Sequence, residues 1–386
     1  PLDVLVIGAG IAGLSAAIAL GKQGNRIVIL EKSAFLREAG AAIHLPPNCT
    51  AVLRWMGIDP LDFGGTLMRE VHCYGLGGNM KYKKEFADIR HLWQAEFYLV
   101  HRVDLHNHLK KRALETATLH TQCKIIDADL EGAHPSVILE DGRIFNADLL
   151  LGADGIHLLP TEELKKYEDT LDFVKDPGVL VEWASDDRRL VAYPCSDNQV
   201  FNVCAFMRST QTKTDTHLGG SQATGAKATI VNAFSEFSPG VKRIIESAED
   251  HPKVWDLYDM KSLPTRTKGH AALLGDAAHP FQPFMGQGAA MAIEDAASIA
   301  TLLPLGTAPD NIPSRLEMYE ASRRDRVEFV LHYTRLNGRD ENDTSSARMT
   351  AEEMVNAMGI CFNHNAIDHT NSYWKECRGP IAQSPA

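Results

Sequence analysis

The feature that most constrains the fold is a glycine-rich turn near the start of the chain. A short, β-branched apolar run at residues 3–7 (DVLVI) is typical of a buried strand, and it leads directly into GAGIAG at residues 8–13. A helical stretch and a second apolar run, RIVIL at residues 26–30, follow. This order of strand, glycine turn, helix and strand is typical of a Rossmann-like α/β domain, and we predict that fold here.

The residues of the turn have separate tasks in dinucleotide binding. The first glycine permits a tight turn, the second lets the backbone approach a pyrophosphate, and the third allows close packing of helix and strand. The N–H groups at the start of the helix would face the phosphates. An acid at the end of the second strand can accept hydrogen bonds from ribose hydroxyls. The turn alone does not distinguish NAD from FAD, and the residues assigned to this site are Gly8, Gly10, Ala12, Gly13, Glu31 and Lys32.

Two further motifs place an acid at the end of a buried strand. Residues 148–155 (DLLLGADG) end in Asp154 and Gly155 and follow a hairpin predicted around Asp141-Gly142. Residues 271–280 (AALLGDAAHP) contain Asp276. An apolar helical stretch comes next, and its N-terminus can stabilise negative charge; it is preceded by Pro283, Gly286, Gln287 and Gly288.

In this order and spacing the three motifs resemble those of the flavoprotein aromatic hydroxylases, which are single-component FAD-dependent monooxygenases. The likeness covers most of residues 1–330 and is closest to the salicylate hydroxylase-like branch, which includes fungal hydroxylases of phenolic polyketides. It implies that the first motif holds the ADP half of FAD, that the second serves both FAD and NAD(P)H, and that Asp276 holds the ribityl chain. Arg102 matches an arginine that contacts FAD in that family, although it could instead be a solvated charge at a helix start.

The resemblance also implies the reaction. NAD(P)H would reduce the flavin, O2 would add to form a C4a-hydroperoxide, and one oxygen atom would pass to a small phenolic or salicylate-like ring, polyketide-derived rings among them. The start of the helix after Gln287 would offset negative charge on the reduced flavin, and Pro283 would form one wall of the oxygen pocket. His44, in GAAIHLPPN at residues 40–48, would lie near the ring system or else be a polar residue of a turn.

A predicted strand at residues 188–194 (RRLVAYP) carries the expected substrate contacts. Arg189 and Tyr193 are four residues apart, so they share one face of a strand. Related hydroxylases tend to carry His-x-x-x-Tyr there, with both side chains on the substrate. Arginine in place of histidine weakens general-base catalysis but suits a phenolate or carboxylate. An edge-strand arginine beside a packed tyrosine is the alternative.

These motifs predict an FAD-binding domain formed by residues 1–70, 101–160 and 265–305. An inserted β-sheet substrate domain would comprise residues 71–100 and 161–264, and a C-terminal helical region residues 306–386. The Arg323–Arg326 run is expected on a solvated helix face, with a polar loop and one short helix after Asn337. At GADGIHLLPTEEL the chain passes almost directly into the substrate domain, where relatives carry an additional segment, which here is either disordered or deleted.

The composition limits the kinds of partner and the cellular location that we expect for this chain. A net charge of −11, from 39 basic and 50 acidic residues, argues against nucleic acid, and no apolar run is long enough to span a bilayer. Seven cysteines without a CxxC pair suit a reducing, cytoplasmic compartment and give no sign of a metal site. We expect a monomer or a homodimer. Because the chain begins at Pro1, a lost targeting segment stays open. The competing functions are an FAD-dependent epoxidase or dehydrogenase of an indole, alkene or alicyclic compound, a non-catalytic flavin-binding protein, and a plain NAD-dependent dehydrogenase.

Overall fold

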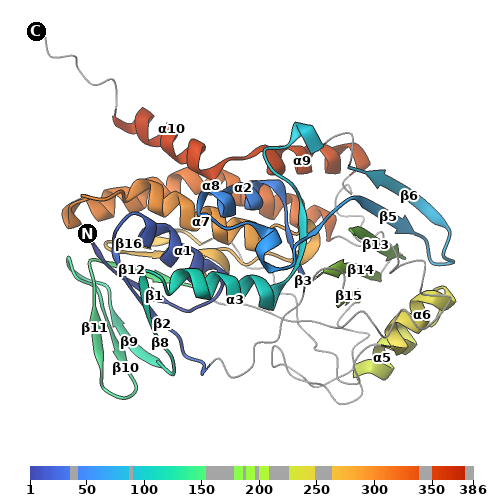
Figure 1. Ribbon diagram of the computed structural model, residues 1–386, viewed down its shortest axis with the longest axis horizontal. Helices are drawn as coiled ribbons and strands as arrows, with labels where there is room; N and C mark the ends of the chain where they lie inside the picture. Colours follow the sequence, from blue (N-terminus) through green and yellow to red (C-terminus); the bar gives the residue numbers. More distant parts are fainter. Residues whose placement is uncertain are drawn as a thin grey trace, which may run out of the picture.

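The amino-terminal strand lies inside a six-stranded sheet, here called the central sheet (Figure 1). The computed structural model describes residues 1–34, 42–86, 90–153, 178–185, 188–195, 200–207, 226–247, 263–338 and 350–378. The strand order is β16-β17-β12-β1-β2-β8, and all neighbours are parallel except β16 and β17. The strands are β1 (Asp3–Ile7), β2 (Arg26–Leu30), β8 (Ala117–His120), β12 (Leu149–Gly152), β16 (Thr267–Lys268) and β17 (Ala271–Leu273). The predicted Rossmann-like sheet is confirmed.

Alternation along β1 explains how the two faces of the central sheet are covered. Val4 and Val6 pack in a cluster with α1 (Ile11–Lys22) and α7 (Gly288–Leu302), whereas Leu5 packs on the opposite face. A three-stranded antiparallel sheet covers that second face; its strands are β9 (Ile125–Asp129), β10 (Ser136–Leu139) and β11 (Ile144–Asn146). The hairpin predicted around Asp141-Gly142 is the β10–β11 connection.

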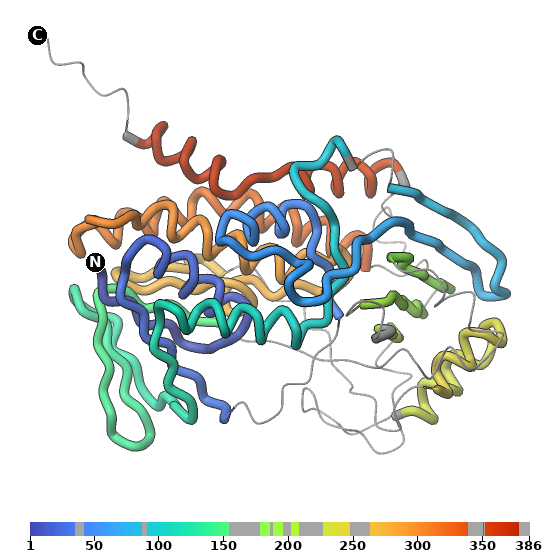
Figure 2. The backbone as a smooth tube through the Cα atoms, viewed as in Figure 1, coloured from blue at the N-terminus to red at the C-terminus, as the bar shows by residue number. Residues whose placement is uncertain are grey.

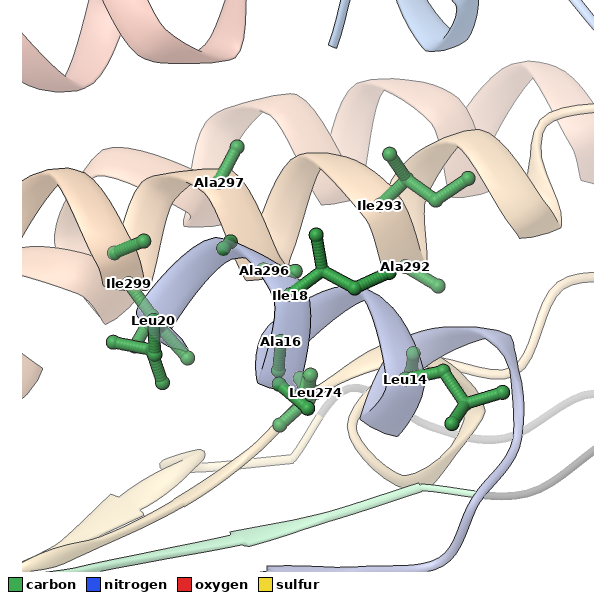
Figure 3. Packing of buried hydrophobic residues seen from close by; sticks show 14 of the residues in the cluster. Leu14, Ala16, Ile18, Leu20, Leu274, Ala292, Ile293, Ala296, Ala297 and Ile299 are labelled. Carbon is green, nitrogen blue, oxygen red and sulfur yellow. The ribbon is translucent and has the colours of Figure 1, made fainter. Parts of the chain in front are cut away.

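The packing of α1 on α7 fixes the glycine turn relative to the third motif. Helix α1 is buried from Ile11 to Gly21, and Figure 3 shows Ile18 and Leu20 beside small residues of α7 such as Ala296. Gly275 lies between the two helices with φ +59°. A Cβ atom on it would come 2.8 Å from Cβ of Ala12 and 3.2 Å from Cβ of Ala292. Only glycine permits this approach, so the first and third motifs meet directly.

A second sheet, here called the insert sheet, has the order β15-β14-β13-β5-β6. Its strands are β5 (Glu70–Tyr74), β6 (Met80–Glu85), β13 (Val179–Ala184), β14 (Arg189–Cys195) and β15 (Val200–Phe206), antiparallel except for β13 with β5. Trp183 and Leu190 pack on the side of α5 (Ala226–Ala233) and α6 (Pro239–Glu246). The opposite face, here called the inward face, carries Leu180 and Tyr193 and packs against Phe97. Figure 1 shows this sheet and β9–β11 at opposite ends of the molecule.

A small sheet joins these two parts. It consists of β3 (Ala42–Leu45), β7 (Tyr98–His101) and β4 (Thr66–Leu67), and it leads into α2 (Pro47–Trp55) and α3 (Arg102–Ala113). Between β3 and α7 the described residues also form short 3-10 turns, namely η1 (Pro60–Phe63), η2 (Arg90–Leu92), η5 (Gly275–Ala277) and η6 (Pro283–Met285). The junction after Gly155 lies outside the described residues, and the domain boundaries given above remain a prediction.

The C-terminal part is helical, as expected. Helix α8 (Ile312–Asn337) follows η7 (Pro309–Asn311), and where one short helix was expected there are two, α9 (Ala351–Asn363) and α10 (Ala366–Arg378). Figure 2 shows α9 and α10 running across the side formed by α2, α7 and α8. Over the described ranges we find no helix with the length and apolar character needed to cross a bilayer. The same residues contain no cluster of three or more acidic, histidine or cysteine side chains that could hold a metal ion.

Candidate active site

The glycine turn after β1 packs too closely against the start of α1 for a side chain at Gly13. Gly8 has φ +93°, and a Cβ atom on Gly13 would lie 2.1 Å from the carbonyl oxygen of Gly8. Gly10 precedes α1 in an extended conformation, and no side chain caps the helix. The start of α1 therefore has no side-chain cap, and backbone N–H groups at such a helix start are the arrangement that binds a pyrophosphate.

Glu31 stands at the end of β2 beside this turn and is buried (6% exposed). Its Oε2 accepts a hydrogen bond from the Ala9 N–H (2.8 Å), and its Oε1 accepts one from the Ser33 N–H (2.8 Å). A carboxylate oxygen has two lone-pair positions, so each can accept a further bond from a ribose hydroxyl. The expected acid is therefore in place, while the neighbouring Lys32 is exposed.

His106 is a residue of this region that the sequence motifs did not reveal. It is buried in α3, and its Nε2 donates to the Ala9 carbonyl oxygen at 2.6 Å. The glycine turn is thus held from two sides, because Glu31 binds the N–H of Ala9 and His106 binds its carbonyl. Arg102 opens the same helix and is half-buried.

The second motif enters the same edge of the central sheet. The Ala153 N–H donates to the Ile7 carbonyl oxygen (2.9 Å), so the chain beyond β12 starts beside the glycine turn. Asp154 and Gly155 themselves lie outside the described residues. Asp276 of the third motif lies in η5 with an exposed side chain.

The start of α7 forms the other end of the site. Pro283 is exposed at the start of η6, Gly286 has φ +60°, and no side chain caps α7. A Cβ atom on Gly288 would meet nothing within 4 Å, so this side of the helix start is open. Gln287 is buried, and its Oε1 accepts from Asn48 Nδ2 at 3.0 Å. Backbone N–H groups at an open helix start suit negative charge.

A buried ionic network lies behind that helix start. Asn48 Nδ2 also donates to Glu294 Oε1 (2.7 Å), and Glu294 accepts from both Arg323 (2.7 Å) and Arg326 (2.9 Å). Arg323 is 1% exposed and Arg326 6%, so the expectation of a solvated Arg323–Arg326 face is wrong for these two residues. Burial disfavours ionised Glu294, but the two guanidinium groups outweigh it and hold its pKa well below the usual range. The helix start is therefore tied to α8 through charge.

The adjacent Asp295 ties the same network to the third motif. Its Oδ2 accepts from the Gly275 N–H (3.0 Å) and from His279 Nε2 (2.6 Å), and its Oδ1 accepts from Arg323 (2.8 Å). Burial would raise the pKa of Asp295, but the charges of His279 and Arg323 lower it to about 2. Neither acid was selected from the sequence, because their partners lie on α8 and in the third motif.

His44 lies where the helix start meets the insert sheet. A Cβ atom on Gly286 would come 2.4 Å from His44 Nδ1, and the imidazole ring lies 4.8 Å from the ring of Tyr193 and 5.7 Å from that of Phe97. Within the part of the chain that the structure describes, the buried Nε2 atom of His44 has no hydrogen-bond partner. Burial lowers the pKa of His44 to about 4, so the imidazole is neutral at neutral pH.

Arg189 and Tyr193 both lie on the inward face of β14. The Arg189 guanidinium lies 5.9 Å from the ring of Phe284 in η6, and its Nε lies 2.8 Å from Oε1 of Glu182. Tyr193 is 5% exposed, and its hydroxyl donates to the Ala42 carbonyl oxygen at 2.9 Å. The two residues share one face of the strand, and each already has a protein partner.

Together these features fit the isoalloxazine and ADP ends of FAD. The uncapped start of α1 would receive the pyrophosphate, the open start of α7 would suit the negatively charged edge of a reduced flavin, and His44 has a buried nitrogen for a further partner. The third motif lies between these two ends of the site. Gly275 packs against both α1 and α7, and its N–H donates to Asp295 of α7.

Comparisons with known proteins identify the family. The family described as FAD binding domain matches residues 1–334. The chain is 30% identical over 371 residues to hispidin-3-hydroxylase of Neonothopanus nambi, covering 85% of this chain and 86% of that protein. It is 30% identical over 364 residues to 3-hydroxybenzoate 6-hydroxylase 1 of Aquipseudomonas alcaligenes, covering 86% and 88%. The crystal structure of CtdE with FAD and a substrate has the same fold, with a TM-score of 0.82, 19% identity and coverage of 97% and 98%. The chain belongs to the FAD-binding family of class A flavoprotein monooxygenases and is an FAD-dependent monooxygenase.

Proposed function

We propose that this monooxygenase uses NAD(P)H and O2 to hydroxylate a small phenolic or salicylate-like ring held between the inward face of the insert sheet and η6. One arrangement carries the proposal: Arg189, Tyr193 and His44 converge beside the open start of α7. Polar side chains that meet at an aromatic surface next to a cofactor cradle are typical of a substrate site.

Bound FAD supplies the redox chemistry, which is hydride uptake from NAD(P)H followed by oxygen activation. The chain's contribution is placement, charge and the exclusion of water. Phe284 and Phe206, whose ring centroids are 5.5 Å apart, provide an apolar wall that keeps water from the reacting oxygen. Pro283 begins the same turn and adds to this wall. The N–H groups at the start of α7, after Gly286 and Gln287, stabilise negative charge on the cofactor.

Three side chains orient the ring in this proposal. Arg189 donates to an oxygen substituent, which enriches the ring in electrons by favouring its ionised or hydrogen-bonded form. Neutral His44 offers its unpartnered Nε2 as a hydrogen-bond acceptor to an N–H or O–H group of the substrate, and its pKa of about 4 keeps the imidazole uncharged. The Tyr193 hydroxyl has committed its proton to Ala42, so its oxygen is left to accept.

The cofactor assignments of the motifs are part of the same proposal. Glu31 holds the ribose of the ADP half, Arg102 contacts FAD from the start of α3, and Asp276 holds the ribityl chain. Lys32, Asp154 and Gly155 complete the set, the last two also serving NAD(P)H. The names of two relatives, a hydroxylase of hispidin and one of 3-hydroxybenzoate, support an aromatic substrate for this chain.

The test is NAD(P)H oxidation by the FAD-loaded protein against a panel of phenols, salicylates and resorcinol aldehydes, with H2O2 and product mass followed together. Ligand-stimulated oxidation that yields a product heavier by one oxygen atom is the expected result. Stimulation that yields only H2O2 would mean that a ligand binds in the wrong orientation. A panel without any stimulation, despite bound and reducible FAD, would contradict the aromatic proposal.

A further inference from the structure

An ion pair occupies the centre of the inward face. Arg189 Nε lies 2.8 Å from Glu182 Oε1, and the side chains are 27% and 23% exposed, respectively. Their sequence neighbours Trp183 and Leu190 pack toward α6, so strand alternation directs Glu182 and Arg189 to the other side. Arg189 also lies over Phe284 of η6. The pair therefore lies on the face that the proposed substrate would contact, opposite Phe284 of η6.

The described groups closest to this pair on the neighbouring strands are uncharged. On β13, β14 and β15, Glu182 and Arg189 are the charged residues of the inward face. The Cys73 thiol lies 3.7 Å from Glu182 Oε2, and burial together with the Glu182 charge raises the pKa of Cys73 to about 12. Burial also raises the pKa of Tyr193 well above its usual value, and His44 is neutral. On the described parts of β13, β14 and β15 the inward face therefore carries one positive and one negative charge, already paired. Lys84 adds a further positive charge on the edge strand β6, opposite Val71.

This pairing changes what the arginine can recognise. A lone guanidinium would bind a substrate carboxylate in a bidentate manner. Here Glu182 already supplies the counter-charge, and a second carboxylate at Arg189 would be repelled by the first at short range. A neutral group that both donates and accepts meets no such penalty. Glu182 Oε2 keeps acceptor capacity beside the weakly donating thiol, and a guanidinium has further N–H donors besides Nε.

We infer that Glu182 is a specificity-determining residue that makes the site select an uncharged ring, with a phenolic hydroxyl beside a carbonyl or carboxamide, over the corresponding carboxylate. The hydroxyl donates to Glu182 and the carbonyl oxygen accepts from Arg189. This inference rests on the proposed function, since it assumes that the inward face is the substrate wall.

The experiment compares two probes of almost equal shape, salicylamide and salicylate, by equilibrium titration of flavin fluorescence in the FAD-loaded protein without NAD(P)H. At pH 7.5 the wild type is expected to bind salicylamide more tightly by about tenfold or more. In Glu182→Gln, the uncompensated guanidinium is expected to shift that ratio by about tenfold or more toward salicylate. Glu236→Gln is the matched control, because Glu236 pairs with Arg188 (3.0 Å) away from the inward face, and its ratio should equal that of the wild type.

Preferential binding of salicylate by the wild type would overturn the inference, as would an unchanged ratio in Glu182→Gln or the absence of binding of either probe. The wild-type comparison needs no variant to fold. Product analysis separates this inference from the proposed function. Salicylate preference with an oxygenated product refutes the role of Glu182 alone, whereas salicylamide preference without hydroxylation of any ring refutes the proposed reaction alone.

Discussion

His44 shows how a single residue can be read differently in sequence and in structure. Its sequence context left a flavin-side residue and a turn residue equally open. The structure gives it neighbours from three elements, since it belongs to β3, lies against Gly286 and contacts the ring of Tyr193. No hydrogen bond from the described residues compensates its buried Nε2 atom. Protonation would place a charge in that setting, and burial accordingly lowers its pKa to about 4.

This pKa predicts a pH-dependent contribution to stability. Between pH 4 and 6.5 the unfolded chain binds a proton at His44 and the folded chain does not, so acidification favours unfolding. The contribution is fully present above pH 6.5 and is lost as the pH falls toward 4. Denaturant unfolding of FAD-loaded His44→Gln is expected to lose less stability than the wild type between pH 7 and pH 4.5, by on the order of 2 kcal/mol. Parallel pH profiles would contradict the assignment.

Other residues at this scale were predictable to different degrees. The need for glycine at Gly8 and Gly13 follows from a local turn, so the sequence spacing was enough to select them. Asn48 and His106 could not be selected in this way. Each acts on a backbone or side-chain group far along the chain, Asn48 on Glu294 and His106 on Ala9, and such contacts leave no local pattern.

Among the elements, α8 is the one for which a prediction from the local sequence fails most clearly. Four charged residues in a row resemble a solvated face, and Arg324 is indeed half-exposed and pairs with Glu320. One position before it and two after it, Arg323 and Arg326 turn inward to the acids of α7. The apolar and alanine-rich sequence of α7 gave no reason to expect two arginines against it. Only Glu294 and Asp295, read as buried acids in need of partners, could have suggested the network.

Replacement of Glu294 by Gln tests how much this ionic network contributes to the free energy of unfolding. The amide keeps the shape but removes the charge that compensates two buried guanidinium groups, so the free energy of unfolding should fall by about 3–5 kcal/mol. Glu140→Gln is the control, since Glu140 forms an exposed pair with Lys124 and its loss should cost about 0–1 kcal/mol. Denaturant midpoints measure both. Equal effects in the two variants would show that the buried pairs add nothing beyond a surface pair.

At the scale of the whole molecule, the backbone of Ala42 in the small sheet is bonded to two side chains of the insert sheet. The Ala42 N–H donates to Asn202 Oδ1 (3.2 Å), and the Ala42 carbonyl accepts from the Tyr193 hydroxyl (2.9 Å). Both side chains come from the insert sheet, whereas Ala42 begins β3 beside the start of α7. The sequence predicted a flavin domain and an inserted sheet, but how the two dock depends on side chains more than 150 positions away.

Tyr193→Phe tests whether this contact controls closure. The variant loses one donor to a buried carbonyl, so the free energy of unfolding should fall by about 1 kcal/mol. A looser joint admits water to the site, and the fraction of NAD(P)H oxidation that ends as H2O2 should rise. The Kd for a bound phenol should rise by only about threefold, because the lost hydroxyl oxygen is one of three groups that orient the ring. Tyr82→Phe, with a 44% exposed side chain on β6, should alter neither quantity. The opposite outcome would be phenol binding that is about tenfold weaker at unchanged stability. In that case the hydroxyl acts on the substrate directly. The docking of the two sheets must then depend on Asn202 and on the apolar contacts around Phe97.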